Sequence, residues 1–159
     1  MKNAPILDRE DLVKFVAEAR SRGEKIILTN GCFDLIHVGH MRYLAGAKAL
    51  GGTVITGINS DEQVRRLKGT GRPFMPENER AEIIASLRSV DAVTVFDEAT
   101  VEELITAIRP DVHAKGTDYS TETVPEREIV RRFGGEVVIV GDPKDHSSTD
   151  MLASINKQD

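Results

Sequence analysis

The residues best suited to chemistry are two histidines, His37 and His40, which lie three positions apart with Gly39 between them. They follow an apolar run, Lys25–Thr29, and they precede a helix expected over Met41–Leu50. Residues at this spacing near a helix N-terminus lie on the same side, and the exposed N–H groups there favour an anion. Two imidazoles can donate hydrogen bonds to phosphoryl oxygens, most strongly where charge develops in a transition state. The pair therefore predicts phosphate chemistry.

Two other interpretations of the histidine pair are possible. The spacing suits metal ligands, but a structural zinc site usually needs four ligands, often cysteines. Cys32 is the only thiol, and the other histidines, His113 and His146, are distant in sequence. An accidental pair of surface or capping histidines is the second alternative. We favour phosphate chemistry over both, with Gly39 leaving room for a phosphate to approach closely.

The elements that must position these side chains form an alternating pattern of apolar runs and amphipathic stretches. The expected strands are mostly rich in Val and Ile: Lys25–Thr29, Thr53–Ile58, Ala92–Phe96, Asp111–Ala114 and Glu136–Val140. Strand–helix alternation predicts a parallel sheet with helices on both faces. We expect an α/β fold with a single Rossmann-like, doubly wound, five-stranded parallel sheet. Ligands of such sheets bind beyond the carboxyl ends of the strands, at the switch point.

Several polar residues are expected to start helices. Asp8 caps a first helix that runs to about Ser21, and a later helix is expected over Glu79–Arg88. Ser148 can cap the last helix. Three pairs fit the capping box, in which two side chains satisfy free N–H groups of a helix N-terminus: Ser60 with Gln63, Thr100 with Glu103, and Thr123 with Glu126.

Length and composition limit the class of protein. With 159 residues, the chain fits one domain over 1–159, with a core over about 24–156 that an N-terminal helix precedes. The formal net charge of -5 argues against broad attraction to nucleic acid. No stretch approaches the roughly 20 apolar residues that span a bilayer, and the N-terminus lacks an apolar signal core. One cysteine fits a reducing compartment, so we expect a cytoplasmic protein without membrane or nucleic-acid partners.

The string T-N-G-C-F-D-L-I-H-V-G-H over residues 29–40 resembles the signature of the nucleotidylyltransferase superfamily, His-x-Gly-His after Gly-x-Phe-Asp. The longer string is similar to the adenylyltransferase domain of bacterial ADP-heptose synthases. The resemblance covers about residues 8–156. It continues through Asn59–Asp61, Arg65–Gly69, Arg72-Pro73, Glu79–Ala81, Val90-Asp91, Arg109–Asp111, Lys115–Tyr119 and Ser148-Thr149.

The resemblance implies an enzyme that transfers AMP from ATP to a sugar 1-phosphate. The acceptor would be D-glycero-β-D-manno-heptose 1-phosphate, and the products ADP-heptose and pyrophosphate. Mg²⁺ would be held mainly through the nucleotide phosphates, and no metal-binding side chain is assigned. One alternative is a cytidylyltransferase that uses CTP and acts on glycerol 3-phosphate or a similar alcohol phosphate. The other is a nucleotide-binding module without catalysis. Relatives are commonly dimers, so a homodimer is expected.

The resemblance also assigns roles to single residues. His37, His40 and Lys68 would be catalytic, with Lys68 bridging the α-phosphate of the donor and the incoming phosphate. Lys68 and Arg72 would bind the substrate phosphate. The nucleotide would contact Asn30, Gly31, Cys32, Phe33, Asp34, Gly39, Arg80, Lys115, Gly116, Asp118, Tyr119, Ser148 and Thr149.

Structural roles compete with some of these assignments. Arg80 could pair with Glu77, and Asp34 could orient its loop, pair with a cation or contact the metal shell. Two residues depart from the family pattern. Thr117 replaces the second of two glycines before the aspartate, and Asp150 replaces the last threonine of Ser-Thr-Thr. Asp150 would add a negative charge near the phosphates.

Overall fold

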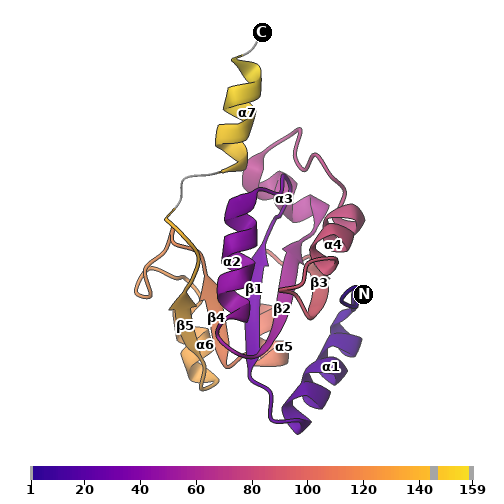
Figure 1. The fold of residues 1–159 in the computed structure, drawn as a ribbon, viewed down its shortest axis with the longest axis vertical. Helices are drawn as coiled ribbons and strands as arrows, with labels where there is room; N and C mark the ends of the chain where they lie inside the picture. Colours follow the sequence, from indigo (N-terminus) through magenta and orange to yellow (C-terminus); the bar gives the residue numbers. More distant parts are fainter. Residues whose placement is uncertain (1, 144–146, 158–159) are drawn as a thin grey trace.

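A five-stranded, all-parallel sheet forms the centre of the computed structural model, which describes residues 2–143 and 147–157 (Figure 1). The strand order is β3-β2-β1-β4-β5. The strands are β1 Ile26–Gly31, β2 Thr53–Asn59, β3 Ala92–Phe96, β4 Val112–Lys115 and β5 Glu136–Ile139. The expected α/β class, the parallel sheet and all five strands are confirmed, with strand ends displaced by at most two residues.

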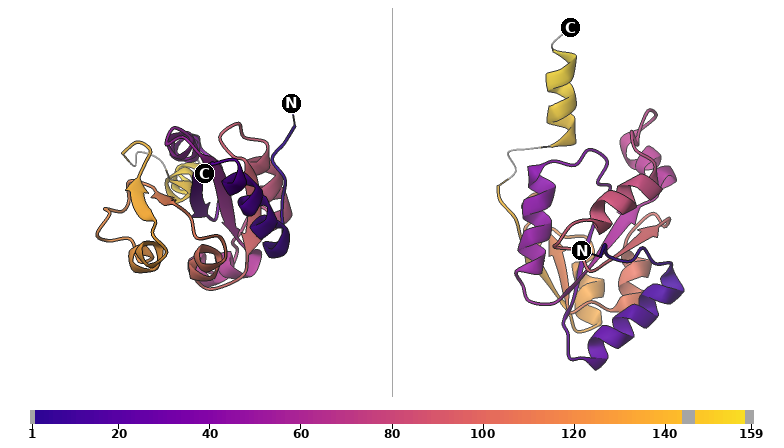
Figure 2. Two further views of the ribbon diagram at one scale, coloured as in Figure 1. Left: turned by 90° about the horizontal axis from the view of Figure 1, so that it is seen from below. Right: turned by 45° about the vertical axis from the view of Figure 1, so that its right-hand side comes forward.

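Helices cover both faces of the sheet (Figure 2). The helices are α1 Arg9–Ser21, α2 Val38–Lys48, α3 Asp61–Lys68, α4 Glu77–Ala85, α5 Glu102–Ile108, α6 Arg127–Arg132 and α7 Ser148–Asn156. Helix α7 extends away from the sheet (Figure 1). The buried side chains of α1, α5 and α6 pack on one face, and those of α2 and α4 pack on the other. In β1, Leu28 faces the first group and Ile27 the second, so the strand is apolar throughout. None of the described helices is long and apolar enough to cross a bilayer.

Helix starts differ from the sequence expectation in several places. Helix α2 begins at Val38, three residues before the expected start, because His37 acts as its N-cap. Ser60 caps α3 as expected, but the Gln63 amide donates to the carbonyl of Asp97 instead of closing the box. Helix α7 is capped by Ser147, whose Oγ accepts from the backbone of Asp150 at 3.0 Å, and not by Ser148.

The two remaining capping boxes are wrong. Helices α5 and α6 begin after Val101 and Glu126, and neither cap residue makes a side-chain hydrogen bond. The hydroxyl of Thr123 instead contacts the backbone and hydroxyl of Ser120 within its own turn. The hydroxyl of Thr100 accepts only a long bond, 3.4 Å, from Glu102. The hydroxyls of Thr100 and Thr123 therefore bond to nearby residues of the chain and do not form the predicted capping boxes.

The sheet opens between β1 and β4. The β1–β2 ladder continues to Gly31, but the β1–β4 ladder ends where Leu28 pairs with His113. Beyond that pair, the phenol of Tyr43 from α2 accepts from the Asn30 backbone at 3.3 Å and donates to the carbonyl of Ala114 at 2.6 Å. This divergence lies at the switch point of the sheet, where ligands of such folds bind.

Helix α1 packs on the same core as the sheet. Leu12, Val16 and Ala19 are buried in a cluster with Leu104 and Ile105 of α5. The start of α1 at Arg9, with Asp8 accepting from Asp11 at 2.8 Å, is as expected. We propose that α1 and the sheet form one folding unit.

Replacing Leu12 by alanine tests this unit. Because Leu12 is fully buried, we expect Leu12→Ala to lower the free energy of unfolding by about 2–5 kcal/mol, in a single urea transition. The matched control is Leu67→Ala, at a side chain that is 61% exposed, where a change within about 0.5 kcal/mol is expected. A single core would be contradicted if both substitutions changed the free energy of unfolding by the same small amount. A separate, earlier unfolding transition for α1 would also contradict it.

Candidate functional site

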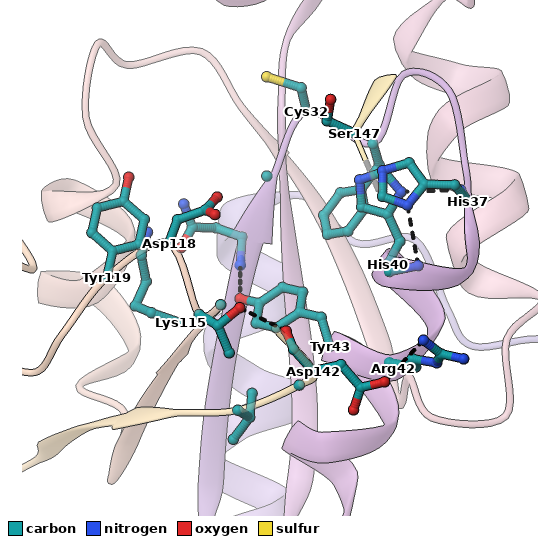
Figure 3. Close-up of a pocket in the computed structure, with 18 of the residues that line it drawn as sticks. Cys32, His37, His40, Arg42, Tyr43, Lys115, Asp118, Tyr119, Asp142 and Ser147 are labelled. Carbon is teal, nitrogen blue, oxygen red and sulfur yellow. Dashed lines mark hydrogen bonds and ion pairs between the residues drawn. The ribbon is translucent and has the colours of Figure 1, made fainter. Parts of the chain in front are cut away.

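A cleft of about 410 Å³ opens at the carboxyl ends of β1 and β4, at the opening of the sheet (Figure 3). The first turn of α2, the loops after β4 and β5 and the start of α7 complete its walls. The sequence-predicted residues that line it are Asn30, Gly31, Cys32, Phe33, His37, Gly39, His40, Lys68, Lys115, Gly116, Asp118, Tyr119 and Thr149. The structure therefore brings most of the expected site into one place. Asp34, Arg72 and Arg80 do not line it, and the side chain of Ser148 lies outside the described part of the chain.

The two histidines form the N-terminal cap of α2 with their own side chains. The Nδ1 atom of His37 accepts from the backbone N–H of Gly39 at 3.1 Å. The Nδ1 atom of His40 accepts from the backbone N–H of His37 at 3.2 Å. A neutral imidazole carries one proton, so each bond leaves that proton on Nε2. The ring centroids lie 3.9 Å apart. The first turn of α2 thus fixes both rings as neighbouring Nε2–H donors.

The cleft keeps His40 neutral. Burial is the largest cause that lowers the pKa of His40, to about 4, and His37 and Lys68 lower it further. At neutral pH the ring therefore donates a hydrogen bond without adding a full charge. Such a preorganised donor is worth most where negative charge grows on a bound oxygen.

Phe33 shapes the loop that leads from β1 to the histidines. Its backbone has a φ of 50°, a left-handed conformation that is uncommon for a bulky residue. Its ring is buried, 5.3 Å from the His40 ring by centroids. A Cβ at Gly31 would lie 3.2 Å from the same ring. Packing on both sides therefore holds the strained turn in place.

Asp34 holds a second loop rather than facing the cleft. Its side chain is fully buried and accepts from Arg72 Nε at 2.7 Å and from the backbones of Phe74 and Met75 at 2.9 and 3.0 Å. Burial alone would raise the pKa of Asp34, but these donors lower it below its usual value. Asp34 thus both orients its loop and pairs with a cation. In this structure, Arg72 serves that pairing rather than lining the cleft.

Arg80 also departs from the expected phosphate contact. Its fully buried guanidinium donates to the carbonyls of Cys32 and Asn59, at 2.7 and 2.8 Å, and to Met75 at 3.0 Å. Its carboxylate partner is Asp61, at 2.7 Å, and not Glu77. A buried charge needs such partners, and they occupy four of its five N–H groups. Arg80 therefore positions the ends of β1 and β2 from beneath the cleft.

Lysines supply positive charge to the cleft. Lys68, the last residue of α3, is exposed at its edge. Lys115 ends β4, and burial lowers its pKa. Its ammonium lies 4.7 Å from the centroid of the Tyr119 ring. Within residues 2–143 and 147–157, no group of three or more His, Cys, Asp or Glu side chains could hold a metal ion.

One polar pair at the cleft is not predicted by the sequence. Arg42 of α2 and Asp142, after β5, form an ion pair at 2.9 Å (Figure 3). The hydroxyl of Thr117 donates to the carbonyl of Asp142 at 2.6 Å. Thr117, which departs from the family pattern, therefore ties the loop after β4 to the loop after β5. The position of Arg42 two residues after His40 was a usable signal, whereas its partner comes from the tertiary fold.

Comparison with known proteins identifies relatives along most of the chain. A family model described as cytidylyltransferase-like matches residues 28–153. The bifunctional protein HldE of Syntrophotalea carbinolica is 46% identical over 147 residues, which are 92% of this chain and 30% of that protein. The bifunctional protein HldE of Caulobacter vibrioides is 47% identical over 151 residues, 95% of this chain and 31% of that protein. The chain thus spans less than a third of the length of these curated relatives.

A solved structure supports the fold. The crystal structure of the lipopolysaccharide core biosynthesis protein from Thermoplasma volcanium GSS1 superposes with a TM-score of 0.67. It covers 77% of this chain and 100% of that one, at 23% sequence identity. At that identity, the likeness bears on the fold alone.

The lowered pKa of His40 predicts how stability depends on pH. The folded value is about 4, whereas an unfolded histidine titrates near 6.5. Between these values the unfolded chain binds more protons, so the free energy of unfolding falls as the pH falls. The contribution of His40 is complete above about pH 6.5 and is lost as the pH falls through about 4. Buried His113, whose pKa is lowered to about 3, acts in the same direction.

Urea unfolding at several pH values between 7 and 5 checks this expectation. The matched control is His40→Asn, because the asparagine Oδ1 can accept the same backbone hydrogen bond and does not titrate. The free energy of unfolding of His40→Asn should depend less steeply on pH, by the equivalent of up to about one bound proton. Identical slopes for the two proteins would contradict the assigned state of His40.

Proposed function

This chain belongs to the cytidylyltransferase-like family of nucleotidyltransferases, and we propose that it transfers an adenylyl group from ATP to a sugar 1-phosphate. The proposed acceptor is D-glycero-β-D-manno-heptose 1-phosphate. The observation that carries the proposal is the pair of Nε2–H donors at the N-terminus of α2, beside the lysines of the cleft. The string T-N-G-C-F-D-L-I-H-V-G-H supports the adenylyl and heptose assignments.

The proposed reaction is one direct displacement. A phosphate oxygen of the acceptor forms a bond to the α-phosphorus of ATP, and the bond from that phosphorus to the β-phosphate oxygen breaks. Pyrophosphate leaves with the electron pair. A phosphate monoester is largely ionised at neutral pH, so the chain needs no strong general base. Catalysis then consists of positioning and charge stabilisation.

The described residues divide this work. His37 and His40 would donate to oxygens of the α-phosphate, where charge grows during displacement. Lys68 would reach both phosphates as a flexible point charge. Gly69 and Gly71, both with positive φ, follow it and give its loop conformational freedom. Asp34 and Arg80 would act indirectly, by holding the loops that carry the contacting groups.

Nucleotidyltransferases generally use a divalent metal ion, and we propose Mg²⁺ for this chain. Mg²⁺ would neutralise the charge on the leaving pyrophosphate. Asp150 lies in the first turn of α7, where its backbone N–H is already used by Ser147. Asp150 is exposed and, unlike its neighbour Thr149, does not line the cleft.

The second candidate is a cytidylyltransferase that acts on glycerol 3-phosphate or a similar alcohol phosphate, and the description of the matching family, cytidylyltransferase-like, favours its choice of nucleotide. Pyrophosphate release by the purified chain with Mg²⁺ separates the two. We expect turnover with ATP and the heptose phosphate, and little with CTP and glycerol 3-phosphate. The reverse pattern would establish the second candidate. Nucleotide binding without release for either acceptor would contradict the proposed acceptors and favour a non-catalytic module.

The control variant separates chemistry from helix capping. His40→Asn retains an acceptor for the backbone of His37 but lacks the Nε2 donor, so we expect at least about a 100-fold loss of turnover with little loss of stability. His40→Ala lacks both groups, so it should also lose about 0.5–2 kcal/mol of stability. Full turnover by His40→Asn would show that His40 serves only as a cap.

A further inference from the structure

His113 is a buried titratable residue that the transfer reaction does not use. It lies in β4, fully buried, and pairs with Leu28 at the last rung before β1 and β4 separate. Its Nε2 lies 2.8 Å from the Oδ1 atom of Asn30, which lines the cleft. Its Nδ1 is buried and has no hydrogen-bond partner among the described residues. Burying a polar atom without a hydrogen-bond partner costs stability.

The direction of this hydrogen bond follows from the orphaned nitrogen. Burial, and then the charge of Lys115, lower the pKa of His113 to about 3, so the ring is neutral and carries one proton. With that proton on Nε2, only a lone pair is left unpaired at Nδ1. The other tautomer would bury an N–H group without an acceptor, which is rarer and costlier. His113 therefore donates to the Asn30 amide oxygen.

The orientation of Asn30 is then fixed at two points. Its Oδ1 accepts from His113, and its backbone N–H is held by the phenol of Tyr43. The remaining group, Nδ2, makes no hydrogen bond to the described residues and is not a buried atom, so it is open to the cleft. An amide NH₂ held in this way is a pure donor. It suits a hydroxyl, a carbonyl or a ring nitrogen of a ligand.

The place of Asn30 separates it from the phosphate contacts. His37 and His40 lie on one side of the cleft, whereas Asp118 and Tyr119 lie on the other (Figure 3). Asn30 contacts His113 of β4, the strand that ends at Lys115 and leads to the loop carrying Asp118 and Tyr119. We propose that His113 is a positioning residue. It turns the Asn30 amide so that Nδ2 donates a hydrogen bond to the nucleoside part of the bound nucleotide. This inference rests on the proposed function.

Calorimetric binding of ATP, CTP and inorganic triphosphate to the whole chain tests this role without requiring turnover. His113→Leu removes the donor, His113→Gln retains one at the position of Nε2, and Asn30→Ala removes the amide. We expect Leu and Ala variants to bind a nucleotide about 3- to 10-fold more weakly, and His113→Gln to bind nearly as well as the original chain. Triphosphate binding should stay unchanged in all three. Equal losses for ATP and CTP would place the contact on the ribose, and a loss for one alone on its base.

The double variant provides the sharpest control. In the Asn30→Ala background, His113→Leu should cause no further loss, because the two residues act through one contact. A further loss of similar size, or a matching loss of triphosphate affinity, would show a merely structural role and overturn the proposal. If His113→Leu does not fold, Asn30→Ala decides, since unchanged nucleotide binding would overturn the proposal by itself. Failure of the proposed reaction would instead appear as intact nucleotide binding without pyrophosphate release.

Discussion

The candidate site depends on two backbone hydrogen bonds in the first turn of α2. A helix N-terminus leaves its first N–H groups without partners, and serine or aspartate usually supplies the acceptor. Here the Nδ1 atoms of His37 and His40 supply it. The same two bonds therefore start the helix, stack the rings and set the tautomers. The spacing in His-x-Gly-His has a physical reason, because it places the imidazoles at N-cap and N3, where each Nδ1 reaches a backbone N–H and Nε2 stays available for an anion.

Buried charges support this turn from below. Arg80 joins the ends of β1 and β2, and Asp34 joins the loop after β1 to the loop that carries Arg72. Each is fully or almost fully enclosed, so each is stable only while its partners are present. The groups left to face the cleft are neutral donors and lysines, together with Asp118 and the Arg42–Asp142 ion pair. This division between structural and contacting charges suits a site that must receive several phosphates and release both a nucleotide-linked product and pyrophosphate.

The sequence was sufficient for the fold and for most of the cleft. Continuous Val- and Ile-rich runs identify buried parallel strands whatever their partners, and strand ends converge at one edge of the sheet. Two kinds of residue could not be placed. Arg80 and Arg72 carry guanidinium groups, which commonly bind phosphates. The orientation of each guanidinium, however, depends on carboxylates and carbonyls that are distant in sequence. Arg42 and Asp142 meet only because α2 and the loop after β5 adjoin. The start of α2 was missed because histidine is not a usual N-cap.

The role of the two imidazoles as donors depends on their tautomers, with the proton of each ring on Nε2. Long-range ¹H–¹⁵N spectra of histidine-labelled protein at pH 7 report which ring nitrogen carries the proton. We predict Nε2–H with an unprotonated Nδ1 for both His37 and His40, and no change of tautomer in His40 down to about pH 5, since its pKa is about 4. A proton on Nδ1 of either ring would break the corresponding cap and would contradict the account.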